Sequence, residues 1–141
     1  MARVHFLVTA LLITIPRAPL VAQGMPSAPP AGAPACFEAA YNAKDAARVA
    51  DCFADTVAVY SVLPDSVHVL HWTRADIPSI YGHIFDRMPK AHQVTLGALS
   101  TGSYFAVHER LDEISPGVSA TGLTVYRSVG GKITGLWSFS N

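Results

Sequence analysis

Apolar residues recur at helical spacing where the folded part of the chain begins. Phe37, Ala40 and Tyr41 lie on one side of a helical turn and predict a first amphipathic helix. The segment 42–44 interrupts this pattern, and Asp45 is typical of the N-cap of a second helix. The inner face of the second helix is predicted to consist of its apolar residues, Val49, Cys52 and Phe53.

A third helix is predicted over residues 77–87, with two candidate starts. A cap at Thr73, which forms a capping-box pattern with Asp76, would leave Pro78 where its missing N–H matters. A cap at Asp76 places Pro78 in the first turn, where proline is tolerated. We favour the start at Asp76.

Residues of alternating polarity, rich in β-branched side chains, predict strands in the rest of the chain. The segment 56–63 is a strand, whereas 67–72 is either a short strand or a loop. Turns that contain glycine or proline separate the later segments. The later strands are predicted at 92–100, 103–113, 118–129 and 132–140. Three helices followed by an antiparallel meander predict an α+β fold.

Residues 1–22 have the layout of a secretory signal peptide, with a charged start, a short apolar run and Ala22 before the preferred cleavage position. The apolar run is too short to span a bilayer as an ordinary helix. We therefore expect a secreted or periplasmic protein with no stable membrane span after cleavage. Residues 23–34 are rich in Pro, Ala, Gly and Ser and predict a flexible tether, which leaves 35–141 as the folded domain.

Cys36 and Cys52 are the two cysteines of the chain, and they are equally distant from the hinge near Lys44. Antiparallel helices joined at that hinge would bring the two side chains together. An exported protein meets an oxidising environment, in which such a pair forms a disulfide. Two buried free thiols are the alternative.

Composition and charge narrow the classes of function. The chain has 141 residues, enough for one domain, and half of them are hydrophobic. Ten basic and ten acidic residues cancel without a basic run, so no nucleic-acid partner is expected. His68 and His71 would point to opposite faces of a strand, and no other ligand pattern accompanies them, so no metal is predicted. The sequence contains no phosphate loop or dinucleotide fingerprint, and no cofactor is predicted.

The segment 104–111 carries the main candidate for chemistry. Side chains alternate across a sheet, so Glu109 shares a face with apolar residues, namely Phe105, Val107 and Leu111. A carboxylate in such surroundings is costly unless it is paired, and desolvation raises its pKa toward the range of a general acid or base. The alternatives are a structural ion pair, or a register slipped by one residue that would turn His108 and Arg110 inward instead.

Several large aromatic side chains belong either to the core or to the wall of a cavity for a flat, apolar ligand. The sequence does not rank these two interpretations. The residues concerned are Trp72, Tyr81, Trp137 and Phe139.

Four segments together have a familiar pattern: A-Y-N-A-K-D, F-A-D-T-V-A-V-Y, V-H-E-R-L and V-Y-R-S-V-G-G-K-I-T-G-L-W. In these segments the chain resembles the nuclear transport factor 2-like superfamily and, within it, the SnoaL-like branch. The resemblance extends from about Cys36 to the end of the chain. The resemblance implies a cone-shaped α+β domain, in which three N-terminal helices pack on a strongly curved antiparallel sheet and enclose a pocket. It also implies a homodimer through the outer face of the sheet.

Ketosteroid isomerase is a catalytic relative within this superfamily, but its machinery is largely missing. The resemblance places its oxyanion tyrosine at Phe37 and its aspartate base at Ser61, neither of which can do that work. A supporting tyrosine matches Tyr81, and the second oxyanion acid falls near Thr124. The Asp-Arg-Asp set of limonene epoxide hydrolase is also absent.

Two hypotheses of function follow. In the first, an exported SnoaL-like protein binds a small apolar molecule, and Glu109 moves a proton on an apolar carbonyl compound in an isomerase, cyclase or hydrolase type of reaction. The predicted hydrogen-bonding and wall residues are Tyr41, Ser61, Tyr81, Trp72 and Trp137, with His108 and Arg110 as further binding candidates. In the second, the domain is a non-catalytic binding or dimerisation module. The sequence leaves open whether the protein is an enzyme, because a fold does not assign a function.

Overall fold

A computed structural model describes residues 31–139 of the protein and contains, within them, three helices and six strands. The predicted signal peptide and residues 23–30 of the predicted tether lie outside the described residues. In chain order the elements are α1 (Ala33–Asn42), α2 (Ala46–Asp51), β1 (Phe53–Leu63), β2 (Ser66–Thr73), α3 (Ile77–Arg87), β3 (His92–Thr101), β4 (Tyr104–Ser115), β5 (Val118–Val129) and β6 (Lys132–Phe139). Because α1 begins at Ala33, the last two residues of the predicted tether belong to the folded domain, where both are buried.

The six strands form one sheet in the order β2-β1-β6-β5-β4-β3. Strands β3 to β6 form the antiparallel meander that the sequence predicts, and the segment 67–72 lies within a full strand, β2, rather than a loop. The sheet as a whole is mixed, because β1 runs parallel to β6. That pairing joins segments far apart in the sequence, and local alternation of polarity carries no information on it.

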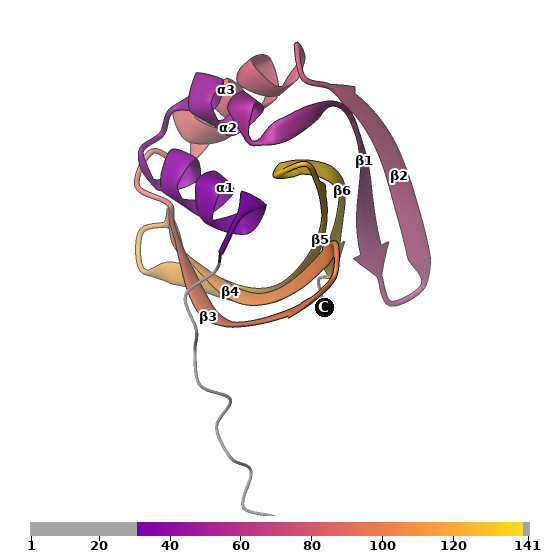
Figure 1. Cartoon of the computed structure of the whole chain (residues 1–141). Coiled ribbons are helices and arrows are strands. Elements are labelled where there is room, and N and C mark those ends of the chain that lie inside the picture. Colours follow the sequence, from indigo (N-terminus) through magenta and orange to yellow (C-terminus); the bar gives the residue numbers. More distant parts are fainter. Residues whose placement is uncertain (1–30, 140–141) are drawn as a thin grey trace, which may run out of the picture.

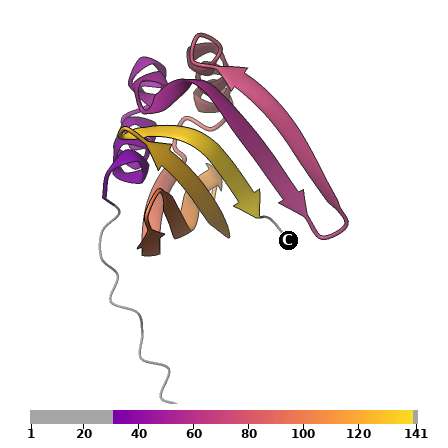
Figure 2. The same ribbon diagram turned by 45° about the vertical axis from the view of Figure 1, so that its right-hand side comes forward.

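The sheet curves around the helices and confirms the predicted α+β cone. Figure 1 shows α1 lying inside the bend of β3 to β6, with α2 and α3 at one end of it. Register shifts interrupt three of the pairings of β3 to β6, and such bulges increase the local bend and twist of a strand. Figure 2 shows the β1–β2 hairpin extending past the rest of the sheet.

Two helix starts follow their predicted capping residues. The side chain of Asp45 accepts a hydrogen bond from the backbone N–H of Arg48 at 3.0 Å, and so caps α2. The third helix begins directly after Asp76, with Pro78 in its first turn. The side chain of Asp76 turns back to accept hydrogen bonds from the N–H and hydroxyl of Thr73.

The second helix ends earlier than the sequence predicts. It stops at Asp51, and Phe53 is already the first residue of β1 instead of part of the helix. The physical cause is pairing with β6, since the N–H of Ile133 donates to the carbonyl oxygen of Cys52 at 2.9 Å. This bond draws the chain into the sheet at the position where the apolar pattern alone would continue a helix.

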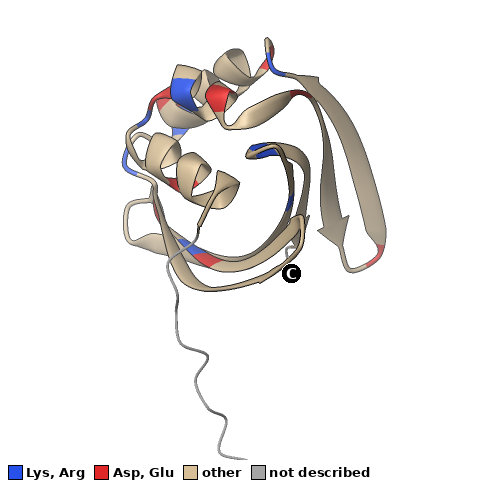
Figure 3. Cartoon of the chain, in the orientation of Figure 1, with Lys and Arg blue, Asp and Glu red and all other residues tan. Residues whose placement is uncertain are grey.

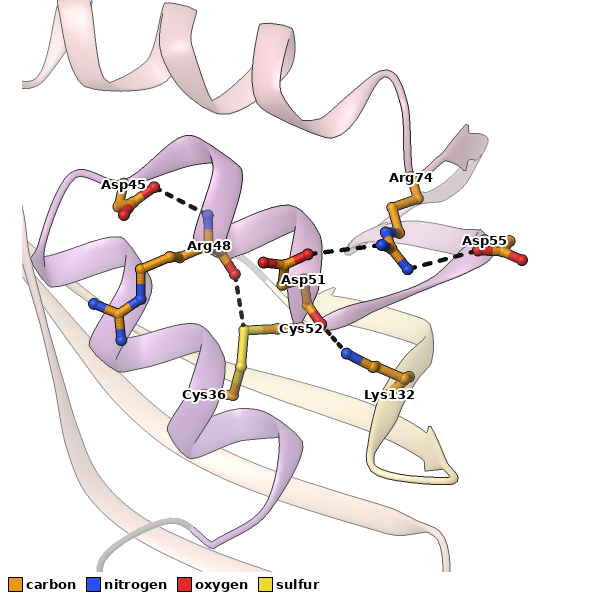
Figure 4. Close-up of polar contacts among 8 residues, drawn as sticks. All are labelled: Cys36, Asp45, Arg48, Asp51, Cys52, Asp55, Arg74 and Lys132. Carbon is orange, nitrogen blue, oxygen red and sulfur yellow. Dashed lines mark hydrogen bonds and ion pairs between the residues drawn. A yellow bond between two sulfur atoms is a disulfide. The ribbon is translucent and has the colours of Figure 1, made fainter.

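Cys36 and Cys52 form a disulfide, which confirms the predicted pairing. Figure 4 shows how it ties α1 to the end of α2. The Sγ atom of Cys52 also lies 3.3 Å from the carbonyl oxygen of Arg48. This approach is a contact rather than a hydrogen bond, because a disulfide sulfur carries no hydrogen.

The core lies between the helices and the concave face of the sheet. Its centre is a cluster of aromatic rings around Phe37, whose ring centroid lies between 5.6 and 6.0 Å from those of its four ring partners. Those partners are Tyr41, Phe53, Tyr81 and Tyr126. Within residues 31–139, no helix has the length and apolar character that a membrane crossing requires.

Candidate functional site

The structure places the side chain of Glu109 on the concave face of the sheet. On β4 the inward residues are those of the predicted apolar face, and Val107 among them is 1% exposed. The outward residues alternate with them, so His108 is exposed on the convex side. Glu109 therefore lies in the lining between sheet and helices, where the removal of water from an anion is costly.

The carboxylate of Glu109 is held by three neutral donors. The hydroxyl of Thr124 donates to Oε1 at 2.6 Å, and the side-chain amide of Gln93 donates to Oε2 at 2.6 Å. The hydroxyl of Tyr126 donates to Oε2 over a longer 3.4 Å. None of the ion pairs found among residues 31–139 includes Glu109. The carboxylate is thus hydrogen-bonded but not neutralised by a cation of the described residues.

The donors reach Glu109 from the two strands that flank β4. Gln93 lies at the start of β3, where the amide of Asn42 at the end of α1 both donates to its carbonyl and accepts from its N–H, each at 2.8 Å. Thr124 and Tyr126 are alternate residues of β5 and therefore share its concave face. The end of α1 thus fixes the backbone of a residue whose side chain orients the carboxylate.

A second acidic side chain joins α1 to β3. Glu38 accepts a hydrogen bond from the hydroxyl of Thr95 at 2.5 Å. Its negative charge acts on Glu109 and favours protonation of that carboxyl. Two acids therefore contribute negative potential to the concave face beneath α1.

Glu109 borders a cavity of about 170 Å³. An engineered apolar cavity of about 150 Å³ in another protein binds benzene, so this space is of the size of one ring. Its walls are mostly aromatic or aliphatic, and its polar groups are concentrated around the carboxylate. The lining residues are Phe37, Tyr81, Gln93, Glu109, Leu111, Thr124, Tyr126 and Leu136.

Burial sets the proton affinities in the cavity. Desolvation raises the pKa of Glu109 above its ordinary value, and the hydrogen bonds from Thr124, Tyr126 and Gln93 oppose this shift without cancelling it. Burial also raises the pKa of Tyr41, Tyr81 and Tyr126, and the charge of Glu109 adds to each of these shifts. All three phenols therefore stay protonated at neutral pH and are able to donate hydrogen bonds.

Two polar groups of the cavity are able to form further hydrogen bonds. An ionised carboxylate offers about four acceptor sites, and Glu109 uses three of them. The hydroxyl of Tyr81 makes no hydrogen bond with any described side chain, although Tyr81 lines the cavity and is only 6% exposed. One acceptor and one donor are thus available to a bound molecule.

The other predicted site residues of the concave side lie near the cavity but do not line it. Tyr41 packs edge-on against Tyr81, with ring centroids 6.3 Å apart, and Trp72 does the same from β2 at 6.5 Å. Ser61 pairs with Ser138, which pairs with Thr124, so Ser61 lies two strand spacings, roughly 10 Å, from the hydroxyl donor of Glu109.

Three predicted binding residues are not brought together with Glu109. His108 and Arg110 belong to the convex face of β4, where Arg110 pairs with Asp112 at 2.8 Å. Trp137 stacks on Tyr60 with a centroid distance of 4.9 Å and lies on the same convex face. Their separation from the acid follows from the alternation of side chains along a strand.

The sequence patterns did not identify Gln93 and Tyr126 as partners of Glu109, or Phe37 as a wall of its cavity. Alternation along 118–129 places Thr124 and Tyr126 on one face, which is a usable signal once that face is known to be concave. Nothing local marks Gln93, because its role depends on Asn42 in a different element.

A larger hollow of about 460 Å³ lies at the end of α3. It is lined by His83, Ile84, Arg87, Met88 and Ile114, and its polar side chains are exposed. Because it lacks a buried acid or base, it is a weaker candidate for chemistry than the smaller cavity at Glu109. Within the described part of the chain, no three His, Cys, Asp or Glu side chains gather as metal ligands would.

No protein-family model and no curated protein matches the chain. Solved structures do resemble it. A protein of ketosteroid isomerase-like fold from Catenulispora acidiphila, in complex with trimethylamine, is 12% identical with a TM-score of 0.63, and the match covers 77% of this chain and 85% of that one. An NTF2-like protein of unknown function from Cytophaga hutchinsonii is 12% identical with a TM-score of 0.60, over 77% and 87% of the two chains.

A putative polyketide cyclase from Sinorhizobium meliloti is 15% identical with a TM-score of 0.62, over 75% of this chain and 92% of its own. The chain therefore has the nuclear transport factor 2-like fold, as its sequence motifs predict. At these identities the likeness establishes the fold alone.

The raised pKa of Glu109 predicts how stability depends on pH. The native state favours the protonated carboxyl of Glu109. The resulting contribution to the free energy of unfolding is therefore complete below the pKa of the unfolded state, near 4.5. It is lost as the pH rises through the higher pKa of the folded state. We expect the unfolding free energy of the wild type to fall relative to that of Glu109→Gln as the pH rises. Urea unfolding at about pH 4 and about pH 8 measures this difference.

Glu113→Gln, which removes an exposed carboxylate of the same strand, is the matched control. A difference between the wild type and Glu109→Gln that stays constant with pH, or that changes in the opposite direction, would contradict the burial of the charge.

Proposed function

We propose that this chain is an exported protein that binds a small, mainly apolar molecule of about one ring in the Glu109 cavity and exchanges a proton with it. The observation that carries the proposal is a partly desolvated carboxylate on the cavity wall with an unused acceptor site and no cationic partner among the described residues. Perturbed carboxylates in cavities are enriched at sites of proton transfer.

The size and lining of the cavity define the class of ligand. About 170 Å³ is below the usual range for drug-sized ligands, so the occupant is a fragment such as a single substituted ring. Aromatic and aliphatic walls favour an apolar body. The polar groups lie around Glu109, so the ligand presents one polar end there.

The two spare polar groups support a proton-transfer reaction on a carbonyl compound. Tyr81 is able to donate a hydrogen bond to a carbonyl oxygen, and Glu109 to accept a proton from the adjacent carbon. Burial raises the pKa of Glu109 and so strengthens it as a base. An isomerisation or a cyclisation of a carbonyl compound begins with such a proton transfer, whereas in a hydrolysis the same base would take its proton from a water molecule.

The second candidate function is binding without turnover. The observation that favours it is the set of three donors on Glu109, which stabilise the ionised carboxylate and weaken it as a base. Phe37 and Ser61 also replace the acid and base of ketosteroid isomerase. The similar Catenulispora protein holds trimethylamine, which supports small-molecule binding by this fold without specifying a reaction.

We also propose that the convex face of the sheet forms a homodimer. Large apolar side chains are exposed there on neighbouring strands, among them Leu99, Tyr104, Leu123 and Phe139. Figure 3 shows most charged residues on the helices and at the ends of strands, which leaves long stretches of the sheet uncharged. The formal net charge of zero removes long-range repulsion between two copies. Such a face is therefore suited to a self-complementary contact.

Export is proposed from the pattern of residues 1–22 and is supported by the disulfide. Disulfides persist in oxidising compartments and are rare in the cytosol. On this proposal the working form of the protein lies outside the cytosol, in the periplasm or the medium.

Deuterium wash-out from the carbon next to the carbonyl of cyclohexanone tests the proposed chemistry. We expect the wild type to bind cyclohexanone and to catalyse the exchange about a hundredfold faster than Glu109→Gln. Leu136→Phe fills the cavity and abolishes binding, whereas Leu70→Phe, on exposed β2, leaves it intact. Calorimetry reports binding, and NMR reports exchange.

If the wild type binds cyclohexanone but exchanges its deuterium no faster than Glu109→Gln does, the proposed proton transfer is wrong. The second candidate function, binding without turnover, would then hold. Failure of the wild type to bind any one-ring compound, whether a neutral one such as cyclohexanone or a cationic amine, would remove the function of the cavity.

The homodimer is tested by Leu123→Glu, which places a charge in the centre of the convex face. Sedimentation equilibrium is expected to give a dimer for the wild type and a monomer for this variant, because a buried unpaired charge is strongly unfavourable. Val118→Glu, at the β4–β5 turn, is the control and stays dimeric. A wild type that sediments as a monomer at high concentration excludes the proposal.

Export is tested by expression of the full chain in a Gram-negative host with its own N-terminus. We expect the mature protein in the periplasmic fraction, with Gln23 at its N-terminus and both cysteines oxidised. Mass spectrometry detects the cleavage and the disulfide together. Full-length protein retained in the cytosolic fraction, or two free thiols after export, contradicts this expectation.

A further inference from the structure

The carboxyl group of Glu109 lines a small cavity and has no cationic partner among the described residues. Its three donors, Gln93, Thr124 and Tyr126, are all neutral, and no ion pair of the described residues includes it. Glu38, which joins α1 to β3 through Thr95, lies close enough for its charge to act on Glu109, so two acids and no described cation contribute to the field at this carboxyl. A cation that enters the cavity meets attraction that is only weakly screened, because the walls are apolar.

The walls of the same cavity suit a cation with an apolar body. Phe37, Tyr81 and Tyr126 contribute aromatic rings to the lining. The π electrons of aromatic rings attract ammonium groups at distances up to about 6 Å. An organic ammonium ion is therefore compatible both with the carboxylate and with the walls, whereas a bare metal ion would find too few oxygen ligands.

The chain already places one ammonium group on this aromatic cluster. The Nζ atom of Lys44 lies 4.6 Å from the ring centroid of Tyr41 and 5.2 Å from that of Phe85. Both rings pack against Tyr81, which lines the cavity. The outer side of the cluster thus holds an ammonium group, while its inner side, next to Glu109, is where the cavity lies.

Hydrogen bonding points the same way. The unused acceptor site of Glu109 is able to take a donor from a ligand, and an N–H of an ammonium group forms a stronger, charge-assisted bond with a carboxylate than a neutral hydroxyl does. An anionic ligand would meet repulsion from both Glu109 and Glu38.

From these contacts we infer that the Glu109 cavity selects a small organic ammonium ion, a protonated amine on an apolar body of about one ring. This inference rests on the proposed binding function of the cavity and specifies its ligand class. With such a ligand, the primary role of Glu109 is to pair with the charge and orient the amine.

Cyclohexylammonium and cyclohexanol form the matched pair of probes that tests the inference. They have the same ring and the same size, and each donates a hydrogen bond, but only one is charged. Calorimetric titration of the wild type at neutral pH is expected to give at least about tenfold tighter binding of cyclohexylammonium. Glu109→Gln, which keeps the size of the side chain but removes its charge, is expected to bring the two affinities to within about twofold.

The outcomes separate this inference from the proposed function. If the wild type binds cyclohexanol as tightly as cyclohexylammonium or more tightly, the ammonium preference is wrong and the cavity remains a site for neutral molecules. If it binds neither probe, the cavity function itself fails and the inference fails with it. The comparison within the wild type decides the matter even if Glu109→Gln does not fold.

Discussion

The carboxylate of Glu109 is partly buried, and its hydrogen bonds place a constraint on the whole concave face. Donors from β3 and β5 must reach an acid on β4 at 2.6 Å, so the three strands have to keep their registers and their bend. Loss of one of the two short donor bonds would leave a partly buried carboxylate less well hydrogen-bonded, which destabilises the fold. The acid and the curvature of the sheet are therefore interdependent.

The first helix takes part in the same constraint. Its last residue, Asn42, binds both backbone groups of Gln93, and its first half carries Phe37 into the cavity wall. The disulfide at Cys36 attaches this helix to the start of β1. One element thus closes the cavity and orients a donor of Glu109. A shift of α1 would change the volume of the cavity and the proton affinity of the acid together.

The sequence predicted what depends on local pattern. Alternation along 104–111 placed Glu109 inward, and glycine-containing turns delimited the meander, because both signals come from adjacent residues. Contacts between distant segments were not predictable in this way. The parallel pairing of β1 with β6 is one example, and the bond between Asn42 and Gln93 is another. Trp137 lies on the convex face, with its ring over Gly135, where any larger side chain would clash with it. Aromatic character alone does not say which face a residue takes.

The most direct test of the buried carboxylate is an NMR titration of its side-chain carboxyl carbon, assigned by comparison with Glu109→Gln. The midpoint is expected above the ordinary value of 4.5, because burial outweighs the three hydrogen bonds. Saturation with cyclohexylammonium is expected to lower that midpoint, since a cation favours the ionised form. A midpoint at or below 4.5 in the free protein would show that desolvation does not outweigh the hydrogen bonds to Glu109, and would contradict the raised proton affinity on which its proposed role depends.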